Sequence, residues 1–415
     1  MDNACISTAH YVWNRKAVIT CSLALYFSVH FFSVFLRYDY LFLEAFFLAL
    51  FFCVSAKLKL KYVALFPLLT AIGIRYFAGH SGVTGYFAPV YHLVKYFRLL
   101  SIPLLIDSFA QVTPRQKKFL VSEISVCILL TNLISLYYAH INPLSIRYRG
   151  LLDQVDYYGI IRFSQIFSFA IIEVFLFALF LDSDIPVQKK AFPALVFAVN
   201  SLMLVKAQLM TPVALTLMVA ALYFFFETGK FAKRFLVFPL ALILFAARKP
   251  ILTFFIARIQ KMHSTIMSRR AEAILNALLD SGGQTNSLSA RLVKIQISWT
   301  SFLQRPYLGI GFTTFDMTTV GCHQDWFDIL AVSGVFVFLI VLIFFAFQFR
   351  DAMRKCEDKK ARHMCAAAFI AFLILGFINA TLASDLLITV FILAPNYRLL
   401  GGTYDKRIYL YRSYL

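Results

Sequence analysis

One short stretch of the chain gathers polar side chains directly before a long hydrophobic run. It reads GCHQDWFDIL over residues 321–330 and leads into AVSGVFVFLIVLIFFAF. His323 is the side chain there that can exchange a proton near neutral pH. In a helix, Asp325 would point away from His323, whereas Trp326 would share its face. A thiol nucleophile at Cys322 is disfavoured, because a small residue at a turn explains that position.

A second set of candidates consists of basic residues that interrupt the expected charge pattern near or within hydrophobic runs. They include Lys95, Arg162 and Arg291. Arginine binds phosphate oxygens through two parallel hydrogen bonds, and a lipid diphosphate is a natural ligand for such groups. A basic group near a span usually faces the bundle interior or a water-filled cavity. The alternatives are a solvated loop face, anionic-lipid contact or, for Arg162, a side chain that reaches back to the membrane surface.

The composition indicates which class of protein carries these residues. The chain has 415 residues, 60% of them hydrophobic and 15% charged, and a mean hydropathy of +0.75. Soluble domains are about 45–50% apolar and about one quarter charged, so we expect an integral membrane protein. Backbone groups in lipid must pair within the chain, and the strand alternation of a barrel is absent, so the spans should be helices.

The net charge of +19 does not by itself indicate a nucleic-acid partner, because Lys and Arg gather in cytoplasmic loops of membrane proteins. Seven cysteines without C-x-x-C pairs indicate neither a disulfide framework nor a metal site. The first hydrophobic run lacks small-residue cleavage chemistry and resembles a first span rather than a removable signal.

The basic clusters between hydrophobic runs predict an all-α polytopic membrane protein with about twelve transmembrane helices and both termini in the cytoplasm. Residues 1–250 would hold nine spans, 251–325 a large external loop, and 326–415 three more spans and a cytoplasmic tail. The expected spans are 17–36, 40–56, 62–78, 87–108, 119–139, 159–181, 191–206, 210–226, 235–250, 326–349, 364–381 and 385–400. The seventh and eighth would form a tight hairpin with Lys206 near its tip.

The external loop should be an ordered domain that contains the candidate site. LSARLVKIQISWTSFLQ has apolar residues at helical spacing with basic residues between them. RPYLGIGF is a Pro/Gly turn that leads towards His323. The loop therefore predicts a helix, a turn and then the start of the tenth span.

These elements resemble the O-antigen ligase and polymerase superfamily. The resemblance rests on Arg291, Trp299, the P-x-x-G-x-G turn from Pro306 to Gly311, His323 followed by Gln324, and Gly334. The segment GIIRFSQIFSFAII, with Arg162, is similar to the family's R-x-S segment that opens a span. The family often has S-R at the hairpin tip where this chain has VKAQLMTP, so Lys206 takes the place of that arginine only by position.

The resemblance implies a GT-C-like glycosyltransferase of the bacterial inner membrane that works at the periplasmic face. Its donor would be a glycan on undecaprenyl diphosphate, and a polymerase would pass the growing chain to the next lipid-linked repeat unit. A ligase would instead pass it to the core sugar of lipid A. The run HQDWFDIL favours a polymerase, whereas SLSARL would also suit a ligase. Membrane lipids and a chain-length regulator protein are further expected partners, without a nucleic acid.

Within this interpretation, His323 would activate the acceptor hydroxyl and Arg291 would stabilise the leaving diphosphate. Arg162, Lys95 and Lys206 would be further diphosphate ligands. Gln324, Asp325 and Trp326 would contact sugar. Asp325 could instead stabilise the start of its helix, and Trp326 could anchor the membrane interface. No external cluster of acidic residues suggests Mg²⁺ or Mn²⁺, so the expected chemistry needs neither a metal nor another cofactor.

A flippase or other transporter is the remote alternative. Such a protein would carry charges through several spans or consist of two related halves. The sequence shows no similarity between its halves, and its long external loop is asymmetric.

Overall fold

The computed structural model describes residues 2–32, 98–99, 102–141, 161–207, 209–228, 288–310, 324–356, 358–379 and 381–401. Over these ranges the chain is helical and contains no strand. The helices are α1 (Asp2–Phe31), α6 (Pro114–Ile141), α7 (Phe163–Leu181), α8 (Val187–Lys206), α9 (Met210–Glu227), α13 (Leu288–Gln304), α14 (Asp325–Lys355), α15 (Lys359–Gly376), α16 (Ser384–Ile388), the π-helical turn η1 (Thr389–Leu393) and the 3-10 helix η2 (Ala394–Gly401). A further helical stretch covers residues 102–111.

Three of these helices are long and apolar enough to cross a membrane. They are α6, the Ser164–Leu181 part of α7, and α14. Lys16–Phe31 and Thr211–Glu227 are shorter apolar helices. The described chain is therefore an all-helical protein with the character of a membrane protein.

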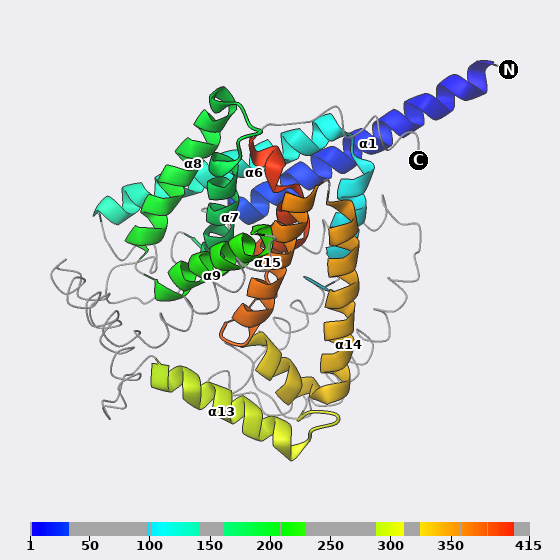
Figure 1. Cartoon of the computed structure of the whole chain (residues 1–415). Helices are drawn as coiled ribbons and strands as arrows, with labels where there is room; N and C mark the ends of the chain where they lie inside the picture. Colours follow the sequence, from blue (N-terminus) through cyan, green and yellow to red (C-terminus); the bar gives the residue numbers. More distant parts are fainter. Residues whose placement is uncertain are drawn as a thin grey trace.

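The predicted spans 40–56, 62–78 and 235–250 lie outside the described residues. The first span was predicted to reach residue 36, but α1 ends at Phe31. Of the external loop predicted over 251–325, the structure describes 288–310 and the final two residues. The helix expected from LSARLVKIQISWTSFLQ is confirmed as α13, which lies across one end of the bundle (Figure 1).

Helix α7 is the centre of the described bundle. It packs against α8, α9, α16, η1 and η2. In its membrane-spanning window 78% of the residues are buried, against 44% in α6 and α14, so α7 is enclosed by protein on most sides. Its near-continuous apolar sequence, FSQIFSFAIIEVFLFALFL, suits that position.

The connection between α8 and α9 is short, as the predicted hairpin requires, but the two helices do not pack mainly against each other. Helix α8 ends at Lys206 and α9 begins at Met210. Helix α8 packs on α6 and α7, whereas α9 packs on α7 and α15. The two helices thus share α7 as a neighbour instead of packing mainly against each other.

One end of the bundle, here called the ion-pair end, is held by charged side chains at helix ends. Lys360 Nζ lies 2.8 Å from Asp182 Oδ1, and Arg398 lies 3.1 Å from Asp182 Oδ2. Arg398 also binds Asp358, which caps α15 by accepting from the Ala361 amide at 2.7 Å. This network joins the end of α7, the start of α15 and η2.

The opposite end, here called the turn end, gathers the start of α7, the C-terminal end of α1, the start of α14 and the segment 381–383 that precedes α16. Helices α7, α14 and η2 approach the ion-pair end with their C-terminal parts, and α15 with its N-terminus. The side of the membrane on which each end lies stays a prediction.

The ionisation of Asp182 makes the stability of the ion-pair end depend on pH. Burial raises the pKa of its carboxyl group, but the hydrogen bond from Lys360, the Asp184 amide and the charge of Arg398 together lower that pKa below its ordinary value. A carboxylate with a lowered pKa stabilises the folded state above its unfolded pKa of about 3.9, and this stabilisation is lost as the pH falls further. We expect thermal unfolding of the detergent-solubilised protein to show Asp182→Asn as less stable than wild type at pH 7, with a difference that narrows as the pH falls below about 4.

Asp184→Asn is the matched control, because the Asp184 side chain is 62% exposed and its ion pairs are screened by water. If the difference in stability between wild type and Asp182→Asn stayed constant with pH, this would contradict the lowered pKa of Asp182.

Candidate functional site

The turn that follows α13 docks onto a break in α14. Helix α14 loses helical geometry at Gly334 (φ 77°, ψ 177°), so a short piece, 325–333, precedes a long straight one (Figure 1). The break leaves backbone groups without helical partners. The Ile310 amide donates to the Ala331 carbonyl, and the Val335 amide donates to the Pro306 carbonyl, each at 2.8 Å. The Pro/Gly turn therefore supplies the hydrogen bonds that the broken helix lacks.

Two glycines allow the turn and the broken helix to approach each other closely. Gly309 has φ 68°, and a Cβ on it would lie 2.3 Å from the Val332 carbonyl oxygen. A Cβ on Gly334 would lie 2.3 Å from the Tyr307 carbonyl oxygen. Both positions thus require the left-handed backbone and the close approach that glycine permits. Gly311, the third glycine of this part of the motif, lies outside the described residues.

Asp328 ties α13 to the start of α14. Its Oδ1 accepts from Ser298 Oγ at 3.1 Å, and its Oδ2 accepts from the Gln324 amide at 3.2 Å. The second bond satisfies a free N–H at the helix N-terminus, where a negative charge is also favourable. Asp328 therefore supplies the N-terminal stabilisation that the sequence analysis considered for Asp325.

Asp325 instead binds a different segment of the chain. Its carboxylate is buried and accepts from the Thr381 amide, from Thr381 Oγ1 at 3.1 Å and from the Leu382 amide at 2.6 Å. These amides belong to the non-helical residues before α16 and have no helical partners of their own. Asp325 thus joins α14 to the α15–α16 connection, whereas sequence analysis expected it to act on its own helix or on a sugar.

Trp326 packs the interior of the bundle. It is 1% exposed, and its Nε1 donates to the Leu373 carbonyl at 2.6 Å. Phe338, Phe345 and Phe372 surround its ring, and a Cβ on Gly376 would come within 2.1 Å of Nε1. This placement differs from the sugar-stacking and interfacial positions expected from the sequence. Trp299 on α13 is 44% exposed and is the more accessible indole among the described residues.

The two residues expected to perform the chemistry flank this assembly. His323 lies outside the described residues, but it directly precedes Gln324, which is buried and held by Asp328. Arg291 lies on α13 seven residues before Ser298, about 10.5 Å away along the helix. The Ser298–Asp328 bond thus connects the helix that carries Arg291 to the backbone beside His323.

Arg162 faces the bundle and holds the end of α1. Its guanidinium donates to the Val29 and His30 carbonyls at 3.1 and 3.3 Å. Gln165 Nε2 also donates to the His30 carbonyl, and Thr131 Oγ1 donates to the Phe31 carbonyl at 2.8 Å. These bonds satisfy the last carbonyls of a helix that ends inside the protein.

A group of buried charged and titratable residues lies beside Arg162, and the sequence analysis did not select it as a site. Arg98 donates to the Leu382 carbonyl at 3.2 Å, and Ser168 Oγ donates to Asp385 Oδ2 at 3.3 Å. The guanidinium groups of Arg98 and Arg162 both lie near His30 and Asp385. The signal for His30 and Asp385 was present, because each falls inside a predicted span, where such groups are costly.

Glu173 is a second buried group that the sequence analysis missed. Its carboxylate, near the middle of α7, accepts from Asn200 Nδ2 at 2.6 Å and from Ser201 Oγ. Asn132 Nδ2 donates to Asn200 Oδ1 at 2.9 Å, so the network joins α6, α7 and α8. It gives three apolar helices one specific arrangement.

The other predicted ligands are not brought to this place by the described structure. Lys206 is exposed at the end of α8, and Lys95 lies outside the described residues. Within the described ranges, no three or more His, Cys, Asp or Glu side chains are grouped as metal ligands would be.

These features define the class as an all-helical protein with three helices that could span a membrane. No family model matches the chain. No curated protein matches it either.

The glycine contact generates a first prediction for this site. Gly334→Ala would place a methyl group against the Tyr307 carbonyl and strain a left-handed backbone, so we expect a loss of about 2 kcal/mol or more in stability. Thermal unfolding of the purified protein measures this loss. Leu339→Ala, on an exposed face of the same helix, is the control and should differ little from wild type. Equal unfolding of Gly334→Ala and wild type would contradict the contact.

The Asp328 contacts generate a second prediction. Asp328→Ala removes two hydrogen bonds and Ser298→Ala removes one, so we expect losses of about 2 and about 1 kcal/mol. The double variant should be at most a few tenths of a kcal/mol less stable than Asp328→Ala, because both changes break the same bond. Asp328→Asn retains an acceptor for Ser298 and should keep more stability. Fully additive losses in thermal unfolding would show that the two side chains do not interact.

Proposed function

We propose that this chain is a GT-C-like glycosyltransferase with about twelve transmembrane helices, which polymerises undecaprenyl-diphosphate-linked repeat units at the periplasmic face of the bacterial inner membrane. Its large loop, over 251–325, would lie in the periplasm and both termini in the cytoplasm. A chain-length regulator protein would be a further partner.

The observation that supports this proposal most is the assembly of the motif segments. Helix α13 carries Arg291, the Pro306–Ile310 turn docks on the break at Gly334, and α14 begins two residues after His323. These residues are separated in sequence by up to 43 positions, yet named hydrogen bonds join their segments at one end of the bundle.

The proposed reaction needs a base for the acceptor and a positive charge for the leaving group. The acceptor hydroxyl oxygen would attack the anomeric carbon while His323 takes its proton. The bond from that carbon to the diphosphate oxygen would break, and Arg291 would stabilise the departing undecaprenyl diphosphate. His323 precedes the N-terminus of α14, whose dipole favours a neutral imidazole and an adjacent anion.

Other residues would contribute to the positive field around the leaving group. Arg162 is a candidate because it lies at the turn end, although its described bonds hold α1. Lys95 and Lys206 are candidates from the sequence resemblance alone. Gln324, beside His323, would help to orient the acceptor.

A complementation experiment tests the function and the site together. In a strain without the endogenous polymerase, lipid A carries single repeat units, and we expect the wild-type chain to restore long glycans on a lipopolysaccharide gel. His323→Ala and Arg291→Ala should abolish extension, because each removes a group that acts in the transfer. Membrane insertion, measured by immunoblot of membrane fractions, should stay at the wild-type level.

Two matched control variants test whether the loss of activity is specific to His323 and Arg291. His140→Ala changes an exposed histidine at the end of α6, and Lys294→Ala changes a basic residue one turn from Arg291 on α13. Both should extend glycans normally. Full activity in His323→Ala or Arg291→Ala would contradict the site assignment.

A ligase is indicated if loss of the chain leaves long glycans on undecaprenyl diphosphate, and a flippase if lipid-linked single units stay on the cytoplasmic side.

A further inference from the structure

Helix α13 is amphipathic, and part of its apolar side faces away from the rest of the described structure. Its apolar stripe follows helical spacing and consists of Ile295, Trp299, Phe302 and Leu303. Of these side chains, Trp299 is 44% and Leu303 58% exposed. The exposed polar residues lie around another side of the helix, with Val293 among them, and are Gln296, Thr300 and Gln304. The helix therefore presents both an apolar and a polar surface to its surroundings.

Ring contacts continue the apolar stripe onto α15 and α14. The Trp299 ring meets Phe327, on the short piece of α14, with centroids 6.3 Å apart, and Phe327 meets Phe377 at 5.7 Å. In the turn after α13, the Tyr307 ring stacks on Phe336 of α14 at 5.9 Å. Phe336 begins an exposed apolar face of α14 that continues through Ile340, Ile343 and Phe347. The turn thus adjoins the apolar outer face of a helix that is long and apolar enough to cross a membrane.

The position of the break in α14 relates this surface to the thickness of a membrane. From the break at Gly334 to the first charged residue, Arg350, the helix runs over 335–349 and is about 22 Å long. The apolar layer of a bilayer is about 30 Å thick. The straight part of α14 is too short to cross this layer, and any tilt shortens its reach further. The break, with the turn docked on it, therefore lies within the apolar layer or at its edge.

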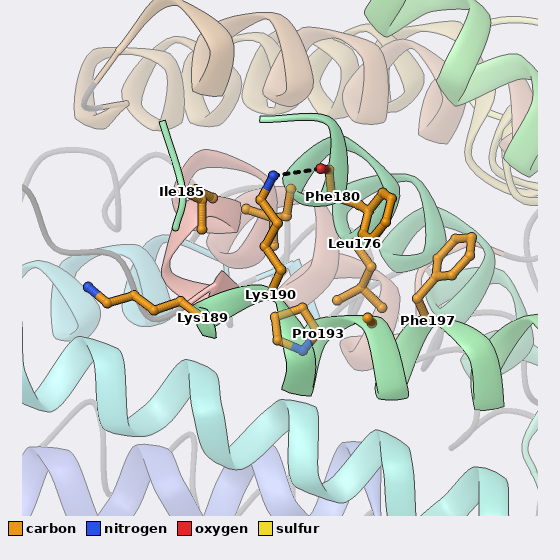
Figure 2. A pocket seen from close by; sticks show the side chains of 9 residues that line it. Leu176, Phe180, Ile185, Lys189, Lys190, Pro193 and Phe197 are labelled. Carbon is orange, nitrogen blue, oxygen red and sulfur yellow. Dashed lines mark hydrogen bonds between the residues drawn. The ribbon is translucent and has the colours of Figure 1, made fainter. Parts of the chain in front are cut away.

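Helix α7 has the length of a full crossing and provides a comparison. It spans Phe163–Leu181 and is about 28 Å long. Charged groups mark both ends, because Arg162 precedes the helix and Lys190 Nζ donates to the Phe180 carbonyl in its last turn at 2.8 Å (Figure 2). The same length measured back from Arg350 along α14 passes the break and reaches the short piece of that helix. The short piece and the turn thus complete the crossing that the straight piece begins.

We propose that α13 and the turn after it lie in the surface of the lipid bilayer at the turn end, with Trp299 and Leu303 among the acyl chains just below the headgroups. An amphipathic helix with tryptophan and leucine on its apolar side is typical of this position. Over 288–310 the chain has three basic residues and no acidic one, which suits the phosphate groups of lipids.

This placement changes how the large loop is understood. Helix α13 is bound to the membrane surface and is not part of a domain surrounded by water. The backbone of Arg291 then lies near the level of the lipid phosphates, because α13 carries it. The inference rests on the membrane character of α14 and is independent of the proposed glycosyltransferase activity.

Quenching of tryptophan fluorescence by lipids tests the proposal in proteoliposomes that contain the full-length protein. The Trp299 emission is the difference between wild type and Trp299→Phe, because Trp13 and Trp326 are common to both. Phosphatidylcholine brominated near the headgroup end of its acyl chains should remove most of this emission. Bromine near the chain ends should remove less, since an interfacial helix reaches only about 5–10 Å below the headgroups. Aqueous iodide should have little effect.

Trp299→Phe/Gln304→Trp is the matched control, because it moves the indole about 140° around the same helix to an exposed polar position. That indole should respond to iodide and little to brominated lipid. Equal quenching of the two positions by brominated lipid would overturn the proposal, as would a Trp299 emission that only iodide quenches. Protection of Trp299 from both quenchers would show that protein covers the stripe and would overturn it as well. None of these readouts depends on glycan transfer.

Discussion

The structure depends on one constraint: a helix that ends or breaks inside the bundle must find partners for its free backbone groups. Water would supply them in a soluble protein, but the interior of a membrane protein does not. Helix α1 ends at Phe31, α14 breaks at Gly334, and the chain is non-helical at 381–383. In each place a side chain or a turn from another element completes the hydrogen bonding.

This constraint explains most of the polar residues at the turn end. Arg162 and Gln165 bind the end of α1, the Pro306–Ile310 turn binds the break in α14, and Asp325 binds Thr381 and Leu382. Several residues that resemble ligands in the sequence therefore already have structural partners. The described contacts also hold the segments that carry Arg291 and His323.

The two ends of the bundle use charge in different ways. At the ion-pair end, acidic and basic groups on several helices neutralise one another, as Asp182, Lys360 and Arg398 do. At the turn end, buried Arg98 and partly buried Arg162 donate to backbone carbonyls and lie beside the buried carboxylate of Asp385. The turn end thus places both arginines near the segments of the candidate site.

The amino-acid sequence was sufficient to predict the class of the protein, the helices α6, α7 and α14, and the helix α13 that carries Arg291. Those features follow from hydrophobicity and periodicity, which are local properties of the chain. Tertiary structure alone decided that Asp328 joins α13 to α14, that Trp326 is buried, and that α8 and α9 pack around α7. The physical reason is that hydrogen-bond partners and burial depend on which segments meet. Helix breaks such as Gly334 create a need for partners that residues distant in the sequence fulfil.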